Sequence, residues 1–243
     1  MEDILIYYCK QLKLGSTIIT NAKTIKYESN ETFLIELLRL ELENRELKRR
    51  NLNLKQANFD VVKTFEGYKA ENVVIPDTLN LQDIKECNFI DRKENLIFYG
   101  PTGRGKTHLA TAIGVEACNR GKRVKFYRTV ALVNDLVEAK QNGNIKKFTK
   151  VFEKLDLLIC DEWGYIPVDK DGAKLLFQVV SECYERRSVI ITTNLEFGNW
   201  NGIFYDEKLT AAIIDRLVHH SHLLLFDGTS YRLENSLMKG IAK

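Results

Sequence analysis

The stretch Gly100-Pro-Thr-Gly-Arg-Gly-Lys-Thr107 decides the fold. It follows a short apolar run at residues 96–99 and precedes a helical pattern that begins near His108. This is the G-x-x-x-x-G-K-[ST] pattern, placed between a predicted strand and a predicted helix, which is the context that supports it. The sequence therefore predicts a loop that binds a polyphosphate.

The residue types of this loop follow from phosphate chemistry. Glycine at 100, 103 and 105 lets the backbone direct N–H groups inward, where a Cβ would obstruct, and the helix N-terminus adds partial positive charge. We expect Lys106 to reach the β- and γ-phosphates and Thr107 to offer its hydroxyl to Mg²⁺. No role is evident for Arg104. The predicted nucleotide-binding residues of the loop are Gly100, Pro101, Thr102, Gly103, Arg104, Gly105, Lys106, Thr107 and His108.

Two adjacent carboxylates, Asp161 and Glu162, follow the apolar run at residues 155–160. Acids at the carboxyl end of a strand lie at the ligand edge of a parallel sheet. We expect Asp161 to bind the nucleotide's Mg²⁺ together with Thr107, mostly through water, and Glu162 to polarise the attacking water. A small-molecule kinase needs no such glutamate, because its substrate hydroxyl is the nucleophile. The pair therefore favours ATP hydrolysis, with ATP and Mg²⁺ as cofactors.

Five short apolar runs alternate with helical stretches from about residue 67 onward. They are residues 96–99, 124–127, 155–160, 189–193 and 223–226. Such strands predict an α/β fold, with a parallel sheet covered on both faces. Asn194 ends the fourth run and would orient the attacking water as a sensor residue; a turn-initiating asparagine is the alternative. This succession of strands and motifs resembles that of the AAA+ family of P-loop NTPases, whose five-stranded sheet has the order 5-1-4-3-2.

The first 66 residues read as helical. Apolar residues recur at helical spacing from Ile4 to Leu12 and again from Phe33 to Leu42, where Ser29 or Asn30 is a candidate cap. We therefore predict a small all-helical N-terminal domain at residues 1–66 and an ATPase domain at residues 67–243. The second helix runs into a basic cluster. Two of its members are Arg49 and Arg50, which suit a helix C-terminus and a DNA contact equally well.

Charge is unevenly distributed, although the formal net charge is only +3. Between residues 120 and 154 there are ten Lys and Arg side chains and three Asp and Glu side chains. This local excess can attract a polyanion, and a solvated face is the alternative. Within it, Lys146, Lys147 and Lys150 are our candidates for contact with the DNA backbone.

Cysteine usage and hydropathy bear on the compartment. The five cysteines are scattered without metal-ligand spacing, which fits a reducing compartment. There is no signal-peptide pattern and no apolar run of about 18 residues. We expect a cytoplasmic protein with no membrane partner. His219, His220 and His222 have no carboxylate or cysteine at ligand spacing, so no metal site is expected there.

Motifs near the C-terminus carry a more specific resemblance. Asp215-Arg-Leu217, His219-His220 and Gly228-Thr-Ser-Tyr-Arg232 resemble the IstB transposition-helper ATPases of bacterial insertion sequences. Residues 54–59 are similar to part of that family's helical N-terminal domain. The nearest relatives of the family are the DnaC-type helicase loaders.

The resemblance implies an AAA+ core without a C-terminal lid and with a helical insertion at about residues 129–153. It also implies that Arg216 is a finger that reaches a neighbouring subunit's γ-phosphate; a surface ion pair with Asp215 or Glu207 is the alternative. An arginine supplied in trans makes hydrolysis depend on assembly, so a homo-oligomeric ring or spiral is expected. Arg232 is either a further phosphate contact or part of a seal on the sheet edge.

The implied function is an ATPase stimulated by DNA. It oligomerises on duplex DNA and assists the IstA-like transposase of the same element, by delivering target DNA and stimulating the transposase. The alternative is a DnaC-like adaptor that loads a replicative helicase. A cytosolic nucleotide kinase is disfavoured by Asp161 and Glu162.

Overall fold

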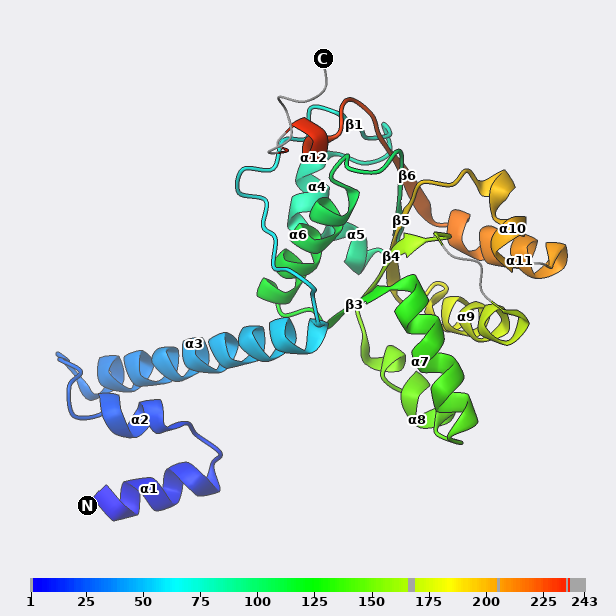
Figure 1. The fold of residues 1–243 in the computed structure, drawn as a ribbon. Helices are drawn as coiled ribbons and strands as arrows, with labels where there is room; N and C mark the ends of the chain where they lie inside the picture. The colour runs from blue at the N-terminus through cyan, green and yellow to red at the C-terminus, as the bar shows by residue number, and fades with distance from the viewer. Residues whose placement is uncertain (1, 166–168, 205, 235, 237–243) are drawn as a thin grey trace. The chain divides into compact units, whose positions relative to one another are not determined.

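The computed structural model describes residues 2–165, 169–204, 206–234 and 236. It divides into two compact units, Met1–Lys55 and Gln56–Lys243 (Figure 1). The sequence places the domain boundary about ten residues later, near residue 66, and that division remains a prediction. No helix among the described residues is long and apolar enough to cross a membrane.

The N-terminal unit is helical, as predicted. It contains α1 (Glu2–Gln11), α2 (Ser16–Asn21) and most of α3 (Asn30–Ala57) around a small core. Ser29 caps α3, since its hydroxyl accepts the backbone N–H of Thr32 at 3.2 Å. Glu41 is buried and accepts the Gly15 N–H and the Arg45 guanidinium, both at 2.7 Å. This carboxylate joins the α1–α2 connection to α3.

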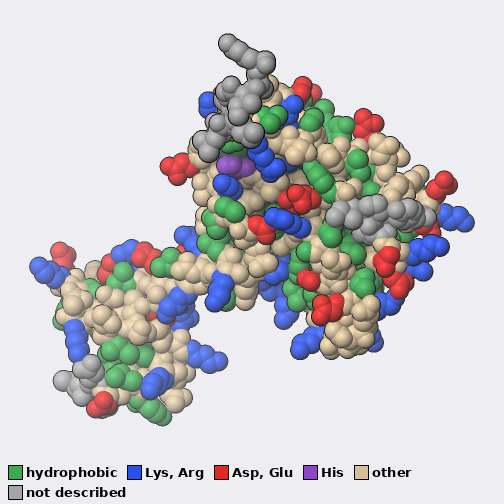
Figure 2. Space-filling view, viewed as in Figure 1, with side chains coloured by type: hydrophobic (Ala, Val, Ile, Leu, Met, Phe, Trp, Pro, Cys, Tyr) green, Lys and Arg blue, Asp and Glu red, His purple; other side chains and the backbone are tan. Residues whose placement is uncertain are grey.

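Helix α3 corrects two expectations. Among the leucines of the apolar pattern from Phe33 to Leu42, only Leu37 is buried, and it packs with Cys9 and Ile18. Leu34, Leu38 and Leu42 are exposed. The surface of this unit accordingly carries a group of hydrophobic side chains (Figure 2). The helix also continues to Ala57, so Lys55 is the basic residue of its last turn. The helix dipole acts over the last turn and does not explain Arg49 and Arg50.

The second unit is built on a six-stranded sheet. Its strands are β1 (Val73–Val74), β2 (Asn95–Tyr99), β3 (Val124–Arg128), β4 (Leu157–Trp163), β5 (Ser188–Thr193) and β6 (Ser221–Phe226). The order is β1-β6-β2-β5-β4-β3. The five predicted strands are parallel and follow the predicted order, while β1 adds an antiparallel edge beside β6 that the sequence analysis missed. Two residues are too few to show a strand period.

Helices cover both faces of this sheet (Figure 1). On one face lie α4 (Leu81–Glu86), α5 (Asn88–Asp91) and α6 (Lys106–Asn119). On the other lie α7 (Thr129–Gln141), α9 (Lys170–Cys183) and α11 (Glu207–Val218). Shorter helices are α8 (Ile145–Thr149), α10 (Asn201–Phe204) and α12 (Tyr231–Glu234), and 3₁₀ turns span Phe152–Lys154 and Phe197–Asn199. Residues 129–153, where a helical insertion is predicted, contain α7, α8 and most of the first 3₁₀ turn, and the insertion itself remains a prediction.

The larger core lies on the side of α7, α9 and α11. Trp163, Trp200 and Phe204 are fully buried there, and the ring of Trp163 lies 5.5 Å from that of Trp200 and 5.9 Å from that of Phe204. All five cysteines are buried free thiols. Asp169 caps α9 by accepting the Gly172 N–H at 2.7 Å, which positions this helix on the sheet.

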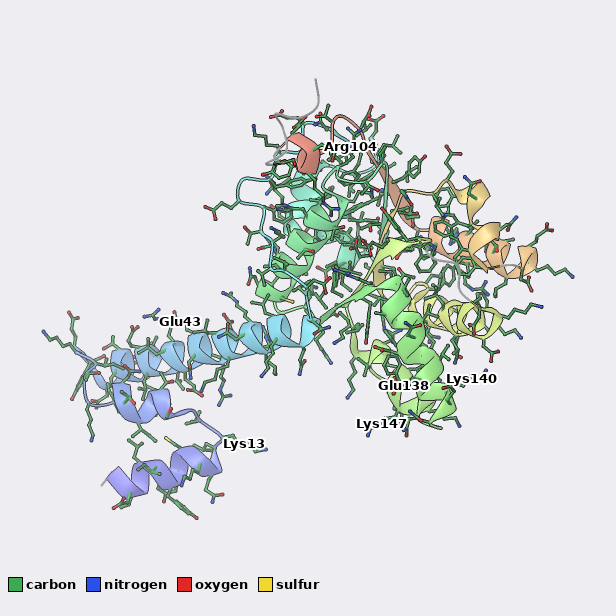
Figure 3. All side chains as sticks on the ribbon, viewed as in Figure 1. Lys13, Glu43, Arg104, Glu138, Lys140 and Lys147 are labelled. Carbon is green, nitrogen blue, oxygen red and sulfur yellow. The ribbon has the colours of Figure 1, made fainter. Side chains whose placement is uncertain are left out.

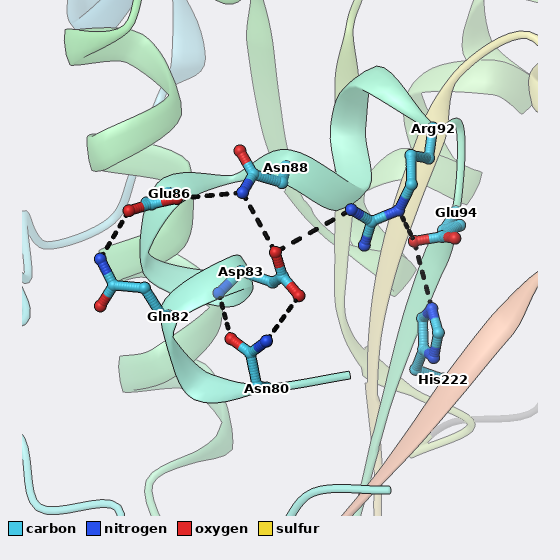
Figure 4. A network of polar contacts seen from close by, with 8 residues as sticks. All are labelled: Asn80, Gln82, Asp83, Glu86, Asn88, Arg92, Glu94 and His222. Atoms are coloured by element: carbon cyan, nitrogen blue, oxygen red, sulfur yellow. Dashed lines mark hydrogen bonds and ion pairs between the residues drawn. The ribbon is translucent and has the colours of Figure 1, made fainter. Parts of the chain in front are cut away.

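A polar network fastens the α4–α5 segment to β6 (Figure 4). Glu94 accepts from Arg92 at 2.8 Å and pairs with His222 at 3.2 Å. Asn88 donates to Asp83 at 3.1 Å, and Arg92 approaches the same carboxylate. This network accounts for His222, whose imidazole is already engaged with a partner.

Candidate nucleotide-binding site

The phosphate loop connects β2 to α6, as its motif predicts. Gly103 and Gly105 have φ of +84° and +88°, a region that side-chain-bearing residues rarely adopt. A Cβ on Gly103 would collide with the Ser230 hydroxyl. Glycine is therefore required at Gly103 both by the backbone and by the close approach of the C-terminal motif.

Lys106 is the first residue of α6 and is only 7% exposed. Its ammonium donates to the carbonyl oxygens of Gly100 and Pro101, the latter at 2.8 Å. Burial lowers the pKa of Lys106 to about 8, and the nearby charges of Arg104 and Arg232 act in the same direction, against Asp161. Three cations thus converge on the loop, and a polyphosphate would offset their repulsion.

Asp161 lies in β4 and is 3% exposed. It accepts hydrogen bonds from the hydroxyls of Thr107 at 3.0 Å and Thr192 at 2.5 Å. Burial raises the pKa of this carboxyl, and the two hydroxyls oppose that shift. The structure thus brings Thr107 and Asp161 together. Thr192 was not predicted from the sequence, although a hydroxyl inside an otherwise apolar strand is a usable signal.

Glu162 has an unusual backbone. Its φ is +57°, and the pairing of β4 with β5 is interrupted between Cys160 and Trp163. Its N–H donates to the Thr192 hydroxyl at 3.0 Å, so one threonine positions both acids. Strained backbone and bulges concentrate beside functional sites, where they redirect a side chain. This geometry fits a carboxylate that must point toward a ligand.

Asn194 follows β5, the strand that lies between β2 and β4. The residue is exposed, and the preceding Thr193 accepts the Gly100 N–H at 3.3 Å. Asn194 therefore lies at the sheet edge that carries the phosphate loop and the two acids. Its role in orienting water remains a prediction.

Arg104 is the residue to which the sequence analysis gave no role. Its Nε and Nη1 atoms are buried and have no hydrogen-bond partner among the described residues. The adjacent Gly103 carbonyl accepts the backbone N–H of Tyr231, so the C-terminal motif is docked against this loop (Figure 3). Buried guanidinium nitrogens without a partner are costly, and an anionic ligand would satisfy these two.

An aromatic pair flanks the start of α6. The rings of Tyr68 and His108 are 5.1 Å apart, and His108 Nε2 lies 3.1 Å from the Thr64 carbonyl. Burial raises the pKa of Tyr68 to about 12. On the other side of the loop, the hydroxyls of Thr102 and Tyr165 are 2.8 Å apart. Tyr68 and Tyr165 belong to no sequence motif, so the sequence alone did not indicate a role for them.

Arg128 ends β3 and is paired in register with Asp161. It forms an ion pair with Asp60 at 2.7 Å, and this contact raises its pKa with smaller contributions from Glu162 and Asp161. In the sequence, Arg128 stands out only as part of a basic segment. The strand register places it beside the acidic pair.

Arg216 lies on α11, away from the phosphate loop of its own chain. Its guanidinium donates to the Ala212 carbonyl at 3.0 Å and lies 4.9 Å from the centre of the Phe177 ring. Among the described residues no ion pair joins it to Asp215 or Glu207. The surface ion-pair alternative therefore finds no support.

Residues 120–154 carry less uncompensated positive charge than their count of basic residues indicates. Four of these basic residues pair with acids outside the segment: Arg120 with Glu116, Lys122 with Asp91, Arg128 with Asp60, and Lys140 with Asp171. Lys146, Lys147 and Lys150 are exposed on and beside α8, where Figure 3 labels Lys147. Three of the six remaining basic residues of the segment therefore lie on or beside α8.

The strand order, the phosphate loop after β2 and the acidic pair in β4 define a P-loop ATP-binding domain of the AAA+ class. The family described as IstB-like ATP binding protein matches residues 9–239. The ATP-binding protein of insertion sequence IS5376 from Geobacillus stearothermophilus is 36% identical over 98% of this chain and 97% of its own length. The chain belongs to the IstB-like ATP-binding family.

Two solved structures share the fold. The DnaC helicase loader superposes with a TM-score of 0.54 at 22% identity, over 68% of this chain and 96% of the loader chain. The replication initiator DnaA bound to AMPPCP and single-stranded DNA gives 0.54 at 21% identity, over 70% of this chain and 52% of that one. Identities this low establish the fold alone, and it is the predicted α/β AAA+ fold.

Proposed function

We propose that this chain is an ATPase that assembles on duplex DNA and assists the transposase of an insertion sequence. The observation that carries the proposal is the cluster around Asp161. Its carboxylate is buried against the Thr107 hydroxyl, and the next residue, Glu162, is turned by a positive φ at the end of the strand. This arrangement suits hydrolysis, because it pairs a metal-binding acid with a candidate general base.

The residues present fit Mg²⁺. A threonine hydroxyl and a carboxylate are hard oxygen ligands, and Mg²⁺ usually keeps several waters beside one or two such groups. Mg²⁺ would neutralise charge on the β- and γ-phosphates. Lys106 and Arg104 would hold the phosphates, and Glu162 and Asn194 would position and polarise the attacking water.

Arg216 is the residue that would make hydrolysis depend on assembly. Because its guanidinium does not reach the phosphate loop of its own chain, it is available to complete the site of a neighbour. A head-to-tail contact of this kind generates rings or spirals, and hydrolysis then requires an assembled oligomer. The insertion-sequence relatives support a transposase as the further partner.

DNA contact is assigned to Lys146, Lys147 and Lys150, with Arg49 and Arg50 of the N-terminal region as further candidates. All five are exposed. Lysines on a surface helix contact phosphates without reading bases, so binding should be insensitive to sequence and sensitive to salt. DnaA, which shares the fold, binds single-stranded DNA. Residues 1–66 are proposed as the domain that contacts DNA or the partner.

Glu162→Gln tests the hydrolytic assignment. The amide keeps the size of the side chain but is a poor base, so turnover should fall at least 100-fold while ATP affinity stays within about threefold. Complexes with duplex DNA and ATP should persist in sizing experiments. Glu153→Gln, an exposed acid of the first 3₁₀ turn, is the control and should behave as wild type. Turnover by Glu162→Gln at the wild-type rate would show that another group activates the water.

A helicase-loading adaptor is the second candidate, favoured by the fold shared with the DnaC loader over 96% of that chain. The full-length protein should be offered a replicative helicase and an insertion-sequence transposase in parallel capture experiments with ATP. Selective capture of the transposase supports the proposed function. Selective capture of the helicase supports the adaptor.

A further inference from the structure

Two turns meet at the end of β2 opposite the phosphate loop. One turn follows α9 and carries Glu185, and the other follows α11 and carries His219 and His220. Each of these residues offers one ligand atom, and the three atoms lie within 4.8 Å of one another. All three residues are exposed. The sequence shows no carboxylate at ligand spacing from these histidines, because Glu185 is 34 residues away from His219 along the chain.

The backbone that carries these side chains is firmly held. Asn95, which begins β2, donates its N–H to the His220 carbonyl at 2.7 Å and its side-chain amide to the Leu217 carbonyl at 3.3 Å. Its side-chain oxygen accepts the Val189 N–H at 2.8 Å. One buried asparagine thus fixes the starts of β5 and β6, just beyond the two turns. Sites that rest on rigid elements hold their ligands at small conformational cost.

The side chains are also oriented by one another. The Tyr184 hydroxyl lies 2.8 Å from Nδ1 of His219, and Nε2 of His220 lies 3.3 Å from Glu185. The two imidazole rings have centres 4.2 Å apart. For His219, the Tyr184 hydroxyl on one ring nitrogen fixes the ring and leaves the other nitrogen for a cation, the arrangement found around metal-binding histidines. The contact between His220 and Glu185 brings two side chains that could both bind the cation next to each other.

We propose that Glu185, His219 and His220 bind a divalent transition-metal ion, with Zn²⁺ as the representative of the class. Two imidazoles and a carboxylate suit such an ion, whereas Mg²⁺ prefers oxygen ligands alone. Ligand atoms around a tetrahedral zinc are about 3.3 Å apart, so the exposed side chains need to close by rotation. Three protein ligands leave a fourth position for water or a further ligand.

The proposed site is separate from the nucleotide site, since the two lie beyond opposite ends of β2. His222 does not belong to it, because Glu94 and Thr78 already engage its ring. A bound ion would join the α9–β5 turn to the α11–β6 turn. It would therefore stabilise the folded chain at the end of α11.

The test is a titration of chelator-treated, full-length protein with Zn²⁺ by calorimetry and with Co²⁺ by absorption. We expect one ion per chain and the visible bands of tetrahedral cobalt. At zinc about 100-fold above its dissociation constant, the melting temperature should rise by roughly 5–10 °C. The proposal would be overturned if the protein did not bind zinc at micromolar concentration. It would also be overturned if bound Co²⁺ lacked the visible absorption bands of tetrahedral cobalt.

Variants locate the ion. His219→Gln, His220→Gln and Glu185→Gln should each weaken zinc binding at least tenfold, and Tyr184→Phe should weaken it less than the ligand variants do. His222→Gln is the matched control and should bind zinc like wild type. Melting curves without metal show whether each variant is folded. Zinc binding that survives in the folded His219→Gln/His220→Gln double variant would also overturn the proposal.

Discussion

The nucleotide site and the basic surface of α8 were both predicted from the sequence, yet they are built in opposite ways. At the nucleotide site, Lys106, Asp161 and Thr192 are buried, and each makes specific hydrogen bonds. Lys106 donates to two carbonyl oxygens of the phosphate loop, and Thr192 donates to Asp161. At α8, Lys146 and Lys147 are exposed on a five-residue helix. A single substitution should therefore act strongly in the first region, whereas the second should respond to the sum of its charges.

Of the variants that compare these two regions, the one that removes all three exposed lysines at α8 should show the largest effect. Changing Lys146, Lys147 and Lys150 together to Gln should weaken duplex binding on the order of 100-fold at low salt and reduce the salt slope by about 2–3. Fluorescence anisotropy across a salt series measures both quantities. Lys140→Gln is the control, since Asp171 already pairs with that lysine. A slope that is unchanged in the triple variant would place the DNA elsewhere.

Thr192→Val should have the next largest effect. Valine keeps the shape of the side chain but removes the hydroxyl that donates to Asp161 and accepts from Glu162. A hydrogen bond to a charged group contributes about 1.5–3 kcal/mol, so ATP turnover should fall by roughly 10–100-fold. Thr193→Val loses a buried hydroxyl that contacts Trp163 instead and serves as the control. Equal turnover in the two variants would remove Thr192 from the site.

Arg104→Met separates ligand binding from stability. ATP affinity should fall about tenfold, because a phosphate contact is lost. The free energy of unfolding without ATP should stay equal or rise, since the variant removes buried N–H groups that have no partner among the residues that the structure describes. Calorimetric ATP titration and urea unfolding measure the two quantities. Loss of stability with unchanged affinity would show that Arg104 is a structural residue.

A further prediction concerns pH. The pKa of Lys106 is lowered to about 8 in the folded chain and is near 10.4 when unfolded. Between these values the unfolded chain binds more protons, so this lysine should make the nucleotide-free protein more stable as pH rises from about 8 to 10.4. Urea unfolding of wild type and Lys106→Met across this range isolates the contribution. If the free energy of unfolding changed with pH in the same way in both proteins, this prediction would be wrong.

The comparison also explains what the sequence was able to predict. The loop, the acidic pair and the five strands follow from local patterns, since Gly100–Thr107 and residues 155–162 each carry their own spacing signal. The order of the strands was implied only by the resemblance to the AAA+ family. The partners Thr192, Tyr68 and Glu185 came only from the structure, because strand pairing and turns bring together residues that are far apart in the chain. The charge count failed in part for the same reason, since Glu116 and Asp171 lie outside the counted segment.

The central claim is that each nucleotide site hydrolyses ATP with an arginine from a neighbouring chain. The most direct measurement is ATP turnover, with duplex DNA, in mixtures of Arg216→Ala and Glu162→Gln protein. Each variant alone should be inactive, and mixing should restore a substantial part of the wild-type rate, because Arg216 of one chain completes the intact Glu162 site of the other. Full activity of Arg216→Ala alone, or no recovery in mixtures that do assemble, would contradict the account.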